Sequence, residues 1–103
     1  MQLKDREQFN EIISSDKLTV VDFFATWCGP CKMLTPVVES VSEKLHGEVN
    51  FVKVDIDVFN DIASEYRIQS VPTLVYIKNG QEINRTVGYM DEDTLLEKVN
   101  SLR

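Results

Sequence analysis

Apolar residues along the chain alternate between two kinds of pattern. The first is the three- and four-residue spacing of a helix with one buried face, which the early residues Phe9, Ile12 and Ile13 follow. Asp5 and Gln8 form a helix-start signal before them, in which the aspartate side chain accepts from the third helical N–H. The second pattern is a short, nearly continuous apolar run from Leu18 to Ala25. Such a run is typical of a strand that is buried on both faces.

The same alternation continues through the middle of the chain. After Cys28 the helical spacing returns, and Gly47 is the expected end of a second helix that buries Met33, Leu34, Val37, Val38, Val41 and Leu45. The run from Val49 to Ile56 predicts a second core strand. A shorter third helix follows, with its apolar positions at Phe59, Ile62, Ala63 and Tyr66.

The last third of the chain predicts a hairpin followed by a helix. Two strands, Thr73–Ile77 and Glu82–Val87, meet across Asn79-Gly80, a pair that favours the tight turn in which both central residues need a positive φ. Asp91 is expected to open the final helix, because acidic residues in a first turn are favoured by the helix dipole. Its buried face would comprise Leu95, Leu96, Val99 and Leu102.

This order of elements predicts an α/β protein with one central mixed sheet. Strands separated by helices pair in parallel, and the hairpin adds an antiparallel end. We expect four to five strands flanked by four helices on both faces, the fifth being a short edge strand around Leu3. A chain of 103 residues has the size of one domain, and no linker or repeat divides it. Residues 1–103 are therefore expected to form a single domain.

Charge and hydropathy narrow the classes of function. The formal net charge is −6, which disfavours nucleic acids and anionic membranes as general partners, because both are negatively charged. No apolar stretch approaches the roughly 20 residues needed to span a membrane. Residues 1–7 lack the apolar core of a secretory signal. We therefore expect the protein in the cytoplasm, where structural disulfides tend to be reduced.

Cys28 and Cys31 are the leading candidates for chemistry, since they lie at the expected junction of a buried strand and a helix. In disulfide exchange one thiol attacks a substrate disulfide as thiolate, and a second thiol resolves the mixed disulfide. The unpaired N–H groups and positive dipole end of a helix stabilise a thiolate. Cys28, at the mouth of the helix, is expected to attack. Cys31, within the first turn, is expected to be more deeply buried and to resolve.

Two other roles for the pair are a buried structural thiol pair and half of a metal site. Zinc usually takes four ligands, often from two Cys-x-x-Cys pairs. The chain has no further cysteine, and His46 is its only histidine, so we expect no metal site within one chain. A disulfide that closes so short a loop would also stabilise the fold little. Redox chemistry is the favoured interpretation.

The stretch from Val21 to Lys32, VDFFATWCGPCK, resembles the active-site signature of the thioredoxin family. Val71-Pro72-Thr73, Asn79-Gly80 and Gly88 match the order and spacing of that family downstream, so the resemblance spans nearly the whole chain. It implies the thioredoxin fold and the reduction of protein disulfides, with Cys28 attacking first and Cys31 resolving. The dipeptide Gly29-Pro30 between the cysteines is typical of the family's reductants.

The resemblance also implies how the protein is recycled. A redox-active disulfide between Cys28 and Cys31 would be reduced by a thioredoxin reductase that draws electrons from NADPH. No cofactor is expected to be bound by this chain itself. The expected partners are the reductase and disulfide-containing client proteins, and the chain is expected to be a monomer.

Asp22 lies inside the first apolar strand, between Val21 and Phe23. Burial of a charge is costly unless it is paired, so burial is expected to raise the pKa of this carboxyl and suit it to proton exchange with a thiol. The alternative is an exposed strand edge. The resemblance implies that Asp22 assists deprotonation of Cys31 and that Lys53 lies near it. The sequence by itself equally allows Lys53 to face solvent.

Pro72 and Trp27 are expected to belong to a docking surface for substrates. An average X-Pro bond is cis only about 5–6% of the time, so physics alone predicts a trans bond at Pro72. The resemblance instead implies a cis-proline loop that faces the cysteines and pairs its Val71 backbone with an extended substrate. Trp27 is either a core aromatic or a partly exposed ring beside the site. The resemblance implies a flat apolar surface formed by Trp27, Gly29, Pro30, Val71, Pro72 and Gly88.

Two alternatives to a general reductase stay open. Tyr89 follows Gly88 where the family usually has a small residue, which favours a specialised protein with a narrow client range. The same apolar surface would also serve a binding module that holds a partner without catalysis.

Overall fold

Helices and strands follow one another in the predicted order. The computed structural model describes residues 2–103. Its helices are α1 (Arg6–Ile13), α2 (Gly29–Lys44), α3 (Asn60–Glu65) and α4 (Glu92–Leu102). Its strands are β1 (Thr19–Phe24), β2 (Asn50–Asp55), β3 (Thr73–Lys78) and β4 (Gln81–Val87). The four predicted helices and the four predicted core and hairpin strands are present, most of them with limits within one or two residues of the expected ones.

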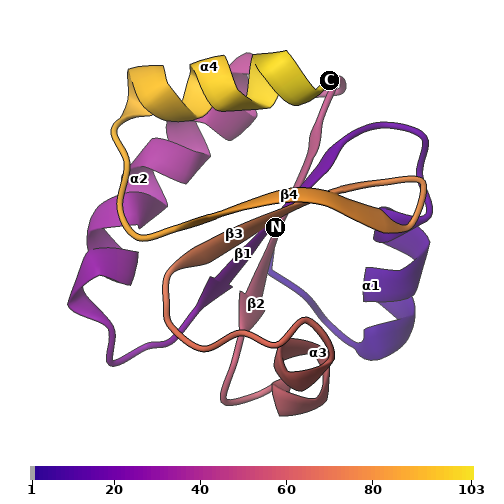
Figure 1. Ribbon diagram of the computed structural model, residues 1–103, viewed down its shortest axis with the longest axis vertical. Helices are drawn as coiled ribbons and strands as arrows, with labels where there is room; N and C mark the ends of the chain where they lie inside the picture. Colours follow the sequence, from indigo (N-terminus) through magenta and orange to yellow (C-terminus); the bar gives the residue numbers. More distant parts are fainter. Residues whose placement is uncertain (1) are drawn as a thin grey trace.

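The strands form one mixed sheet in the order β2-β1-β3-β4. β1 is central: it pairs in parallel with β2 and antiparallel with β3, while β3 and β4 form the antiparallel hairpin. Figure 1 shows α2 and α4 on one side of the sheet and α1 and α3 on the other. The predicted mixed sheet with helices on both faces is confirmed.

The alternation of side chains along β1 divides the core in two. Val20 belongs to the cluster beneath α2 and α4, which also contains Leu34, Val41, Leu74, Tyr76, Leu95 and Val99. Val21 belongs to the cluster beneath α1 and α3, which also contains Phe9, Phe23, Val52, Val54, Ile62 and Ile77. Because Asp22 lies two residues after Val20, its side chain points to the α2 side of the sheet.

Local signals in the sequence determine where several elements begin and turn. Asp5 is the N-cap of α1 and accepts a hydrogen bond from the Gln8 N–H at 2.8 Å. Asp91 caps α4 by accepting from the Thr94 N–H at 2.9 Å. Asn79 and Gly80 have φ values of 54° and 78°, the positive values that the tight turn between β3 and β4 requires.

The second helix, α2, ends earlier than predicted. Its last residue is Lys44, and Gly47, with a φ of 83°, lies in the turn that follows. The carbonyl of Leu45 accepts from the Val49 N–H in that turn, which leads the chain into β2. Within residues 2–103, no helix combines the length and the apolar character that crossing a membrane would need.

The expected edge strand around Leu3 is reduced to a single contact. Gln2 makes an isolated parallel bridge with Lys53, and the Leu3 N–H donates to the Lys53 carbonyl at 3.3 Å. Among the described residues the sheet therefore has four strands, the smaller of the two expected numbers. Leu3 still contributes its side chain to the core beneath α1 and α3.

Candidate active site

The sulfur of Cys28 lies at the joint between β1 and α2. Cys28 is the N-cap of α2, with an extended backbone, and its Sγ accepts a hydrogen bond from the Cys31 N–H at 3.1 Å. Side-chain oxygens take this position in most helices. Pro30 lies in the first turn, where a missing N–H costs nothing. The fold therefore places Cys28 Sγ at the positive end of the helix dipole.

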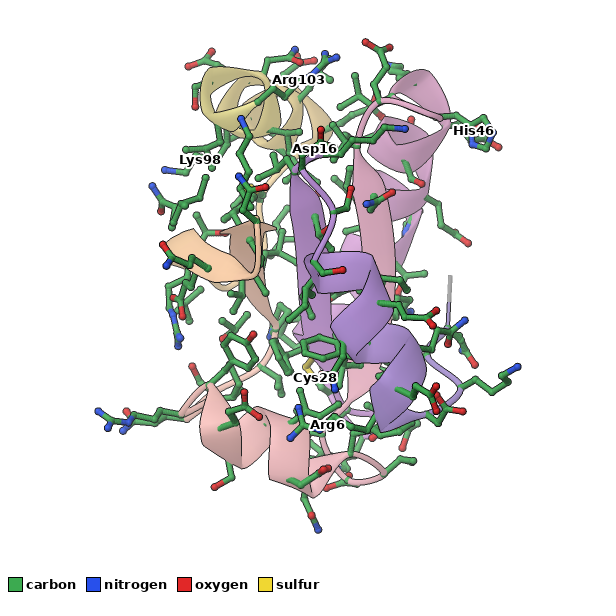
Figure 2. All side chains as sticks on the ribbon, turned by 90° about the vertical axis from the view of Figure 1, so that its right-hand side faces the viewer. Arg6, Asp16, Cys28, His46, Lys98 and Arg103 are labelled. Atoms are coloured by element: carbon green, nitrogen blue, oxygen red, sulfur yellow. A yellow bond between two sulfur atoms is a disulfide. The ribbon has the colours of Figure 1, made fainter. Side chains whose placement is uncertain are left out.

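Cys28 and Cys31 are joined by a disulfide, with their Cα atoms 5.3 Å apart. Both residues are buried, at 5% and 4% exposed, so in the oxidised form Cys31 is only marginally deeper than Cys28. A disulfide within one helical turn brings both sulfurs into the same apolar cluster, where Ala25 and Val71 pack against them. Figure 2 shows Cys28 among packed side chains, in the half of the molecule that contains Arg6 and away from His46 and Arg103.

In the described part of the chain, no neighbouring side chains are placed to complete a metal site with the two cysteines. Across residues 2–103, no three His, Cys, Asp or Glu side chains are grouped so that they would hold a metal ion.

The loop before β3 faces the nucleophile candidate. The Val71–Pro72 peptide bond is cis, as the family resemblance implied. The Val71 carbonyl oxygen lies 3.6 Å from Cys28 Sγ. The Gly88 N–H donates to the Pro72 carbonyl at 2.9 Å, so the end of β4 holds the loop in place. This contact with the loop, rather than burial, distinguishes Cys28 from Cys31.

The predicted docking surface is present in part. Trp27 is 68% exposed, which excludes the core position, and its Nε1 donates to Asp57 Oδ2 at 2.9 Å. Pro72 is buried, contrary to its predicted place on the surface, and its carbonyl accepts a hydrogen bond from the Gly88 N–H. The surface therefore comprises three exposed and two half-buried residues of the predicted set: Trp27, Gly29 and Pro30, then Val71 and Gly88.

Two exposed side chains extend this surface on the β4 side. Val87 pairs with Thr73 at the end of the hairpin and is 63% exposed, and Tyr89 is 48% exposed. Both flank Gly88, which is hydrogen-bonded to Pro72. The sequence pointed to Tyr89 because its side chain is larger than the small residue usual at that position in the resembled family. Val87 carried no such signal, because an apolar residue near a strand end is ordinarily assigned to the core.

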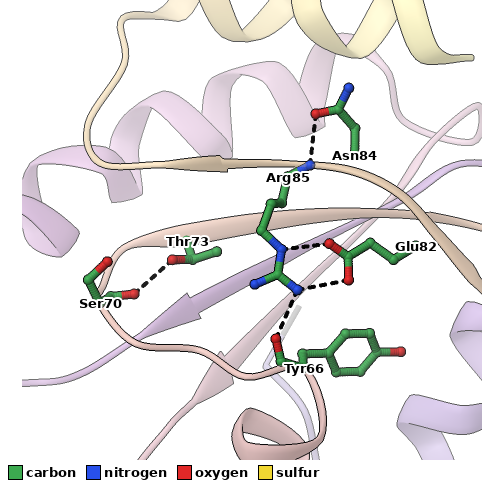
Figure 3. A network of polar contacts seen from close by, with 6 residues as sticks. All are labelled: Tyr66, Ser70, Thr73, Glu82, Asn84 and Arg85. Carbon is green, nitrogen blue, oxygen red and sulfur yellow. Dashed lines mark hydrogen bonds and ion pairs between the residues drawn. The ribbon is translucent and has the colours of Figure 1, made fainter.

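Arg85 anchors the segment that leads to the cis-proline loop. Its guanidinium donates to both carboxylate oxygens of Glu82 and to the Tyr66 carbonyl, at 2.8 Å for the last (Figure 3). Thr73 Oγ1 then donates to the Ser70 carbonyl at 2.7 Å. The chain between α3 and β3 is thus fixed at both ends. Sequence reasoning missed Arg85, since its contact with Tyr66 spans 19 residues.

Asp22 is buried beneath α2, with 2% of the residue exposed. Its Oδ1 has no hydrogen-bond partner. Burial raises the pKa of the carboxyl to about 6, and the positive charge of Lys53 opposes that rise. The exposed-edge alternative is therefore wrong, and the expected direction of the pKa change is confirmed.

Lys53 is the β2 residue in register with Asp22, so both side chains lie on the α2 side of the sheet. It is half-buried: its Nζ lies 4.4 Å from the centre of the Phe24 ring and donates to Thr35 Oγ1 at 3.3 Å. A cavity of about 230 Å³ is lined by Lys53, Thr35 and Cys31 among others. The site therefore brings Lys53 to a cavity that Cys31 also lines, close enough for its charge to act on Asp22. Sequence reasoning missed Thr35, although its position four residues after Cys31 is a known spacing for a hydroxyl that bonds back along a helix.

Comparison with known proteins identifies the family. A family model described as Thioredoxin matches residues 1–101. Thioredoxin H2 from Arabidopsis thaliana is 46% identical over 95 residues, covering 92% of this chain and 70% of that protein. Thioredoxin-1 from Saccharomyces cerevisiae is 45% identical over 87 residues, covering 84% of each chain. The crystal structure of Malassezia sympodialis thioredoxin has a TM-score of 0.89 and 42% identity, covering 97% of this chain and 87% of that one.

The buried carboxyl predicts a pH-dependent cost to stability. Between about pH 4 and 6 the native Asp22 keeps a proton that the unfolded chain has lost, so stability falls as the pH rises through this window. A rise in pKa from 3.8 to about 6 corresponds to about 3 kcal/mol at neutral pH. Asp22→Asn should therefore stabilise the oxidised protein by up to that amount at pH 7.5 and by little at pH 4.

Urea unfolding at both pH values measures this difference. Asp16→Asn is the matched control, because Asp16 is exposed and its substitution should change stability little at either pH. An Asp22→Asn variant that is no more stable than the wild type at pH 7.5 would contradict the cost assigned to the buried charge.

Proposed function

The chain belongs to the thioredoxin family, and we propose that it reduces client disulfides with Cys28 as the attacking thiol and Cys31 as the resolving thiol. It is a thiol–disulfide oxidoreductase of the protein-disulfide reductase type, as its relatives and the Cys28–Cys31 disulfide indicate. The assignment of Cys28 as the attacking thiol and Cys31 as the resolving thiol rests on the hydrogen bond from the Cys31 N–H to Cys28 Sγ. It supports Cys28 as the more stable thiolate, because it directs a helix N-terminal donor at that sulfur.

The proposed reaction has two exchanges. Starting from the reduced dithiol, the Cys28 thiolate attacks one sulfur of the client disulfide, forms a Cys28–client disulfide and releases the other client sulfur as a thiolate. The Cys31 thiolate then attacks Cys28 Sγ, forms the Cys28–Cys31 disulfide and releases the second client thiolate. The client gains two electrons, and the dithiol loses two.

In the second exchange Cys31 must lose a proton before it attacks. We assign the acceptor role to the Asp22 carboxylate, because burial raises its pKa to about 6, near the operating pH of a useful general base. Lys53 supports this role as the nearby positive charge that keeps part of the carboxyl population ionised. Asp22 and α2 lie on the same side of the sheet, which supports transfer between them.

The client is proposed to bind as an extended segment along the cis-proline loop. The Val71 backbone lies beside Cys28 and supports pairing with a strand-like segment. Trp27, Gly29 and Pro30 would contact the client on one side of the cysteines, and Gly88 on the other. Pro72 shapes the loop from beneath.

Recycling is proposed to proceed through a thioredoxin reductase that takes electrons from NADPH. The chain would act as a monomer, in the cytoplasm, with no cofactor of its own. The support is the family membership together with the reducing chemistry of the dithiol, which requires a compartment that keeps thiols reduced.

A specialised protein with a narrow client range is the second candidate. The observation that favours it is Tyr89, which is 48% exposed beside Gly88 and adds a large ring to the rim of the client surface. A non-catalytic binding module is a weaker alternative, because such a role would not need both cysteines.

Substitution of either cysteine should produce its own defect in disulfide reduction. With dithiothreitol as reductant, the wild type should accelerate insulin-disulfide reduction, and Cys28→Ser should fall to the rate of dithiothreitol alone, because it lacks the attacking thiol. Cys31→Ser should instead accumulate a Cys28–client disulfide, visible by mass spectrometry without reductant. The double variant Cys28→Ser, Cys31→Ser is the control and should trap nothing. Full activity of Cys28→Ser would refute the mechanism.

Recycling by a thioredoxin reductase should require the attacking thiol of this protein. NADPH consumption in the presence of a thioredoxin reductase and insulin should depend on this protein and should be lost in the Cys28→Ser control. The general reductase role is wrong if the protein reduces insulin normally with dithiothreitol but shows no turnover with the thioredoxin reductase of its own host. The specialised protein would then be the better description.

A further inference from the structure

The ammonium group of Lys53 is held by two contacts on the α2 side of the sheet. Its Nζ lies 4.4 Å from the centre of the Phe24 ring, within the range of a cation–π interaction. It also donates a hydrogen bond of 3.3 Å to Thr35 Oγ1. These contacts fix the direction of a side chain that otherwise rotates freely about four bonds.

The Thr35 hydroxyl is oriented by its own helix. Its Oγ1 donates to the Cys31 carbonyl at 3.1 Å, the usual contact with the residue four positions earlier. A hydroxyl has one proton and two lone pairs, so a proton committed to Cys31 leaves only acceptor capacity toward Lys53. Thr35 therefore links the helix that carries Cys31 to the ammonium group on β2.

Asp22, the expected direct partner of Lys53, forms no ion pair with it in the described part of the chain. Asp22 is in register with Lys53, yet its Oδ1 has no hydrogen-bond partner. Space for movement exists, because Lys53 lines three separate cavities of about 520, 300 and 230 Å³. The observed restraints on the Lys53 ammonium are therefore its contacts with Phe24 and Thr35.

We infer that Thr35 is a positioning residue that holds the Lys53 ammonium over Phe24 and keeps it from pairing directly with Asp22. The inference rests on the proposed function, in which Asp22 takes the proton of Cys31. A carboxylate in a direct ion pair is a weaker base than one that feels the same charge from farther away. By holding Lys53 aside, Thr35 keeps Asp22 basic enough to accept a thiol proton.

Other charged and titratable groups near this region stay the same when Thr35 alone is changed. Lys32 lines the cavity shared with Cys31, Asp55 lines one of the other two, and both Glu39 and Glu43 line the largest. Tyr76, on the same face of β3, has a pKa raised by burial and remains neutral near pH 7. A comparison of Thr35 variants therefore isolates the position of Lys53.

The test follows the Asp22 carboxyl directly, by its ¹³C chemical shift across a pH titration of the oxidised protein. Thr35→Val removes the hydroxyl with almost no change in shape, and it should lower the Asp22 midpoint by about one pH unit, a tenfold change in the acid dissociation constant. Thr35→Ser keeps the hydroxyl and should titrate like the wild type. Thr35→Ala provides a second deletion should the valine variant fold poorly.

A double-variant comparison separates positioning from a structural effect. In the Lys53→Met background, Thr35→Val should leave the Asp22 midpoint unchanged, because the charge that Thr35 positions is gone. An unchanged or raised midpoint in Thr35→Val alone, or a lowered midpoint that persists without Lys53, would overturn the inference. The titration does not depend on whether Asp22 acts as the base. Failure of the proposed function would appear separately, as normal insulin reduction by Asp22→Asn.

Discussion

The hydrogen bond from the Cys31 N–H to Cys28 Sγ requires that the first strand end and the second helix begin at fixed places. β1 provides the first condition, because pairing with β2 on one side and β3 on the other fixes its position within the sheet. α2 provides the second, because Cys28 caps it and Pro30 lies in its first turn. The cis-proline loop and the buried aspartate can contribute to disulfide exchange only if that sulfur is held in this place.

The strand that positions the nucleophile also carries a feature that weakens the fold. Asp22 lies in the same strand as Val20 and Val21, each fully buried in one of the two core clusters. A leucine or valine in its place would remove the cost of burying a charge. The large apolar clusters on both faces tolerate the cost, and functional sites are where such departures from a well-packed core are expected.

The contacts that orient this site come from several elements. The end of β4 holds the cis-proline loop through Gly88, while Arg85 on the same strand holds the preceding segment through the Tyr66 carbonyl. On the other side of the sheet, Thr35 connects α2 to Lys53 on β2. Every one of these contacts links residues that are far apart in sequence or belong to different elements.

Because the contacts that orient the site join distant segments of the chain, the sequence could predict the local features but not these contacts. Periodicity, caps such as Asp5 and Asp91, and the Asn79-Gly80 turn are local, so the order of the elements and the mixed sheet followed from them. The burial of Asp22 also followed, because its strand is apolar on both sides. The cis bond at Pro72 came only from the family resemblance, since an isolated X-Pro bond favours trans. The nearly equal burial of the cysteines and the Thr35–Lys53 contact depend on tertiary packing, which no local pattern records.

The reactivity of Cys28 in the reduced protein tests the central claim most directly. The rate of alkylation by iodoacetamide, followed across pH with mass spectrometry to locate the modified residue, reports the thiolate. Because its sulfur lies at the N-terminus of α2, Cys28 should be alkylated before Cys31. The midpoint of its pH profile should lie clearly below the pKa of about 8.5 for a free thiol. Alkylation of Cys31 first, or a midpoint equal to that of a free thiol, would contradict the account.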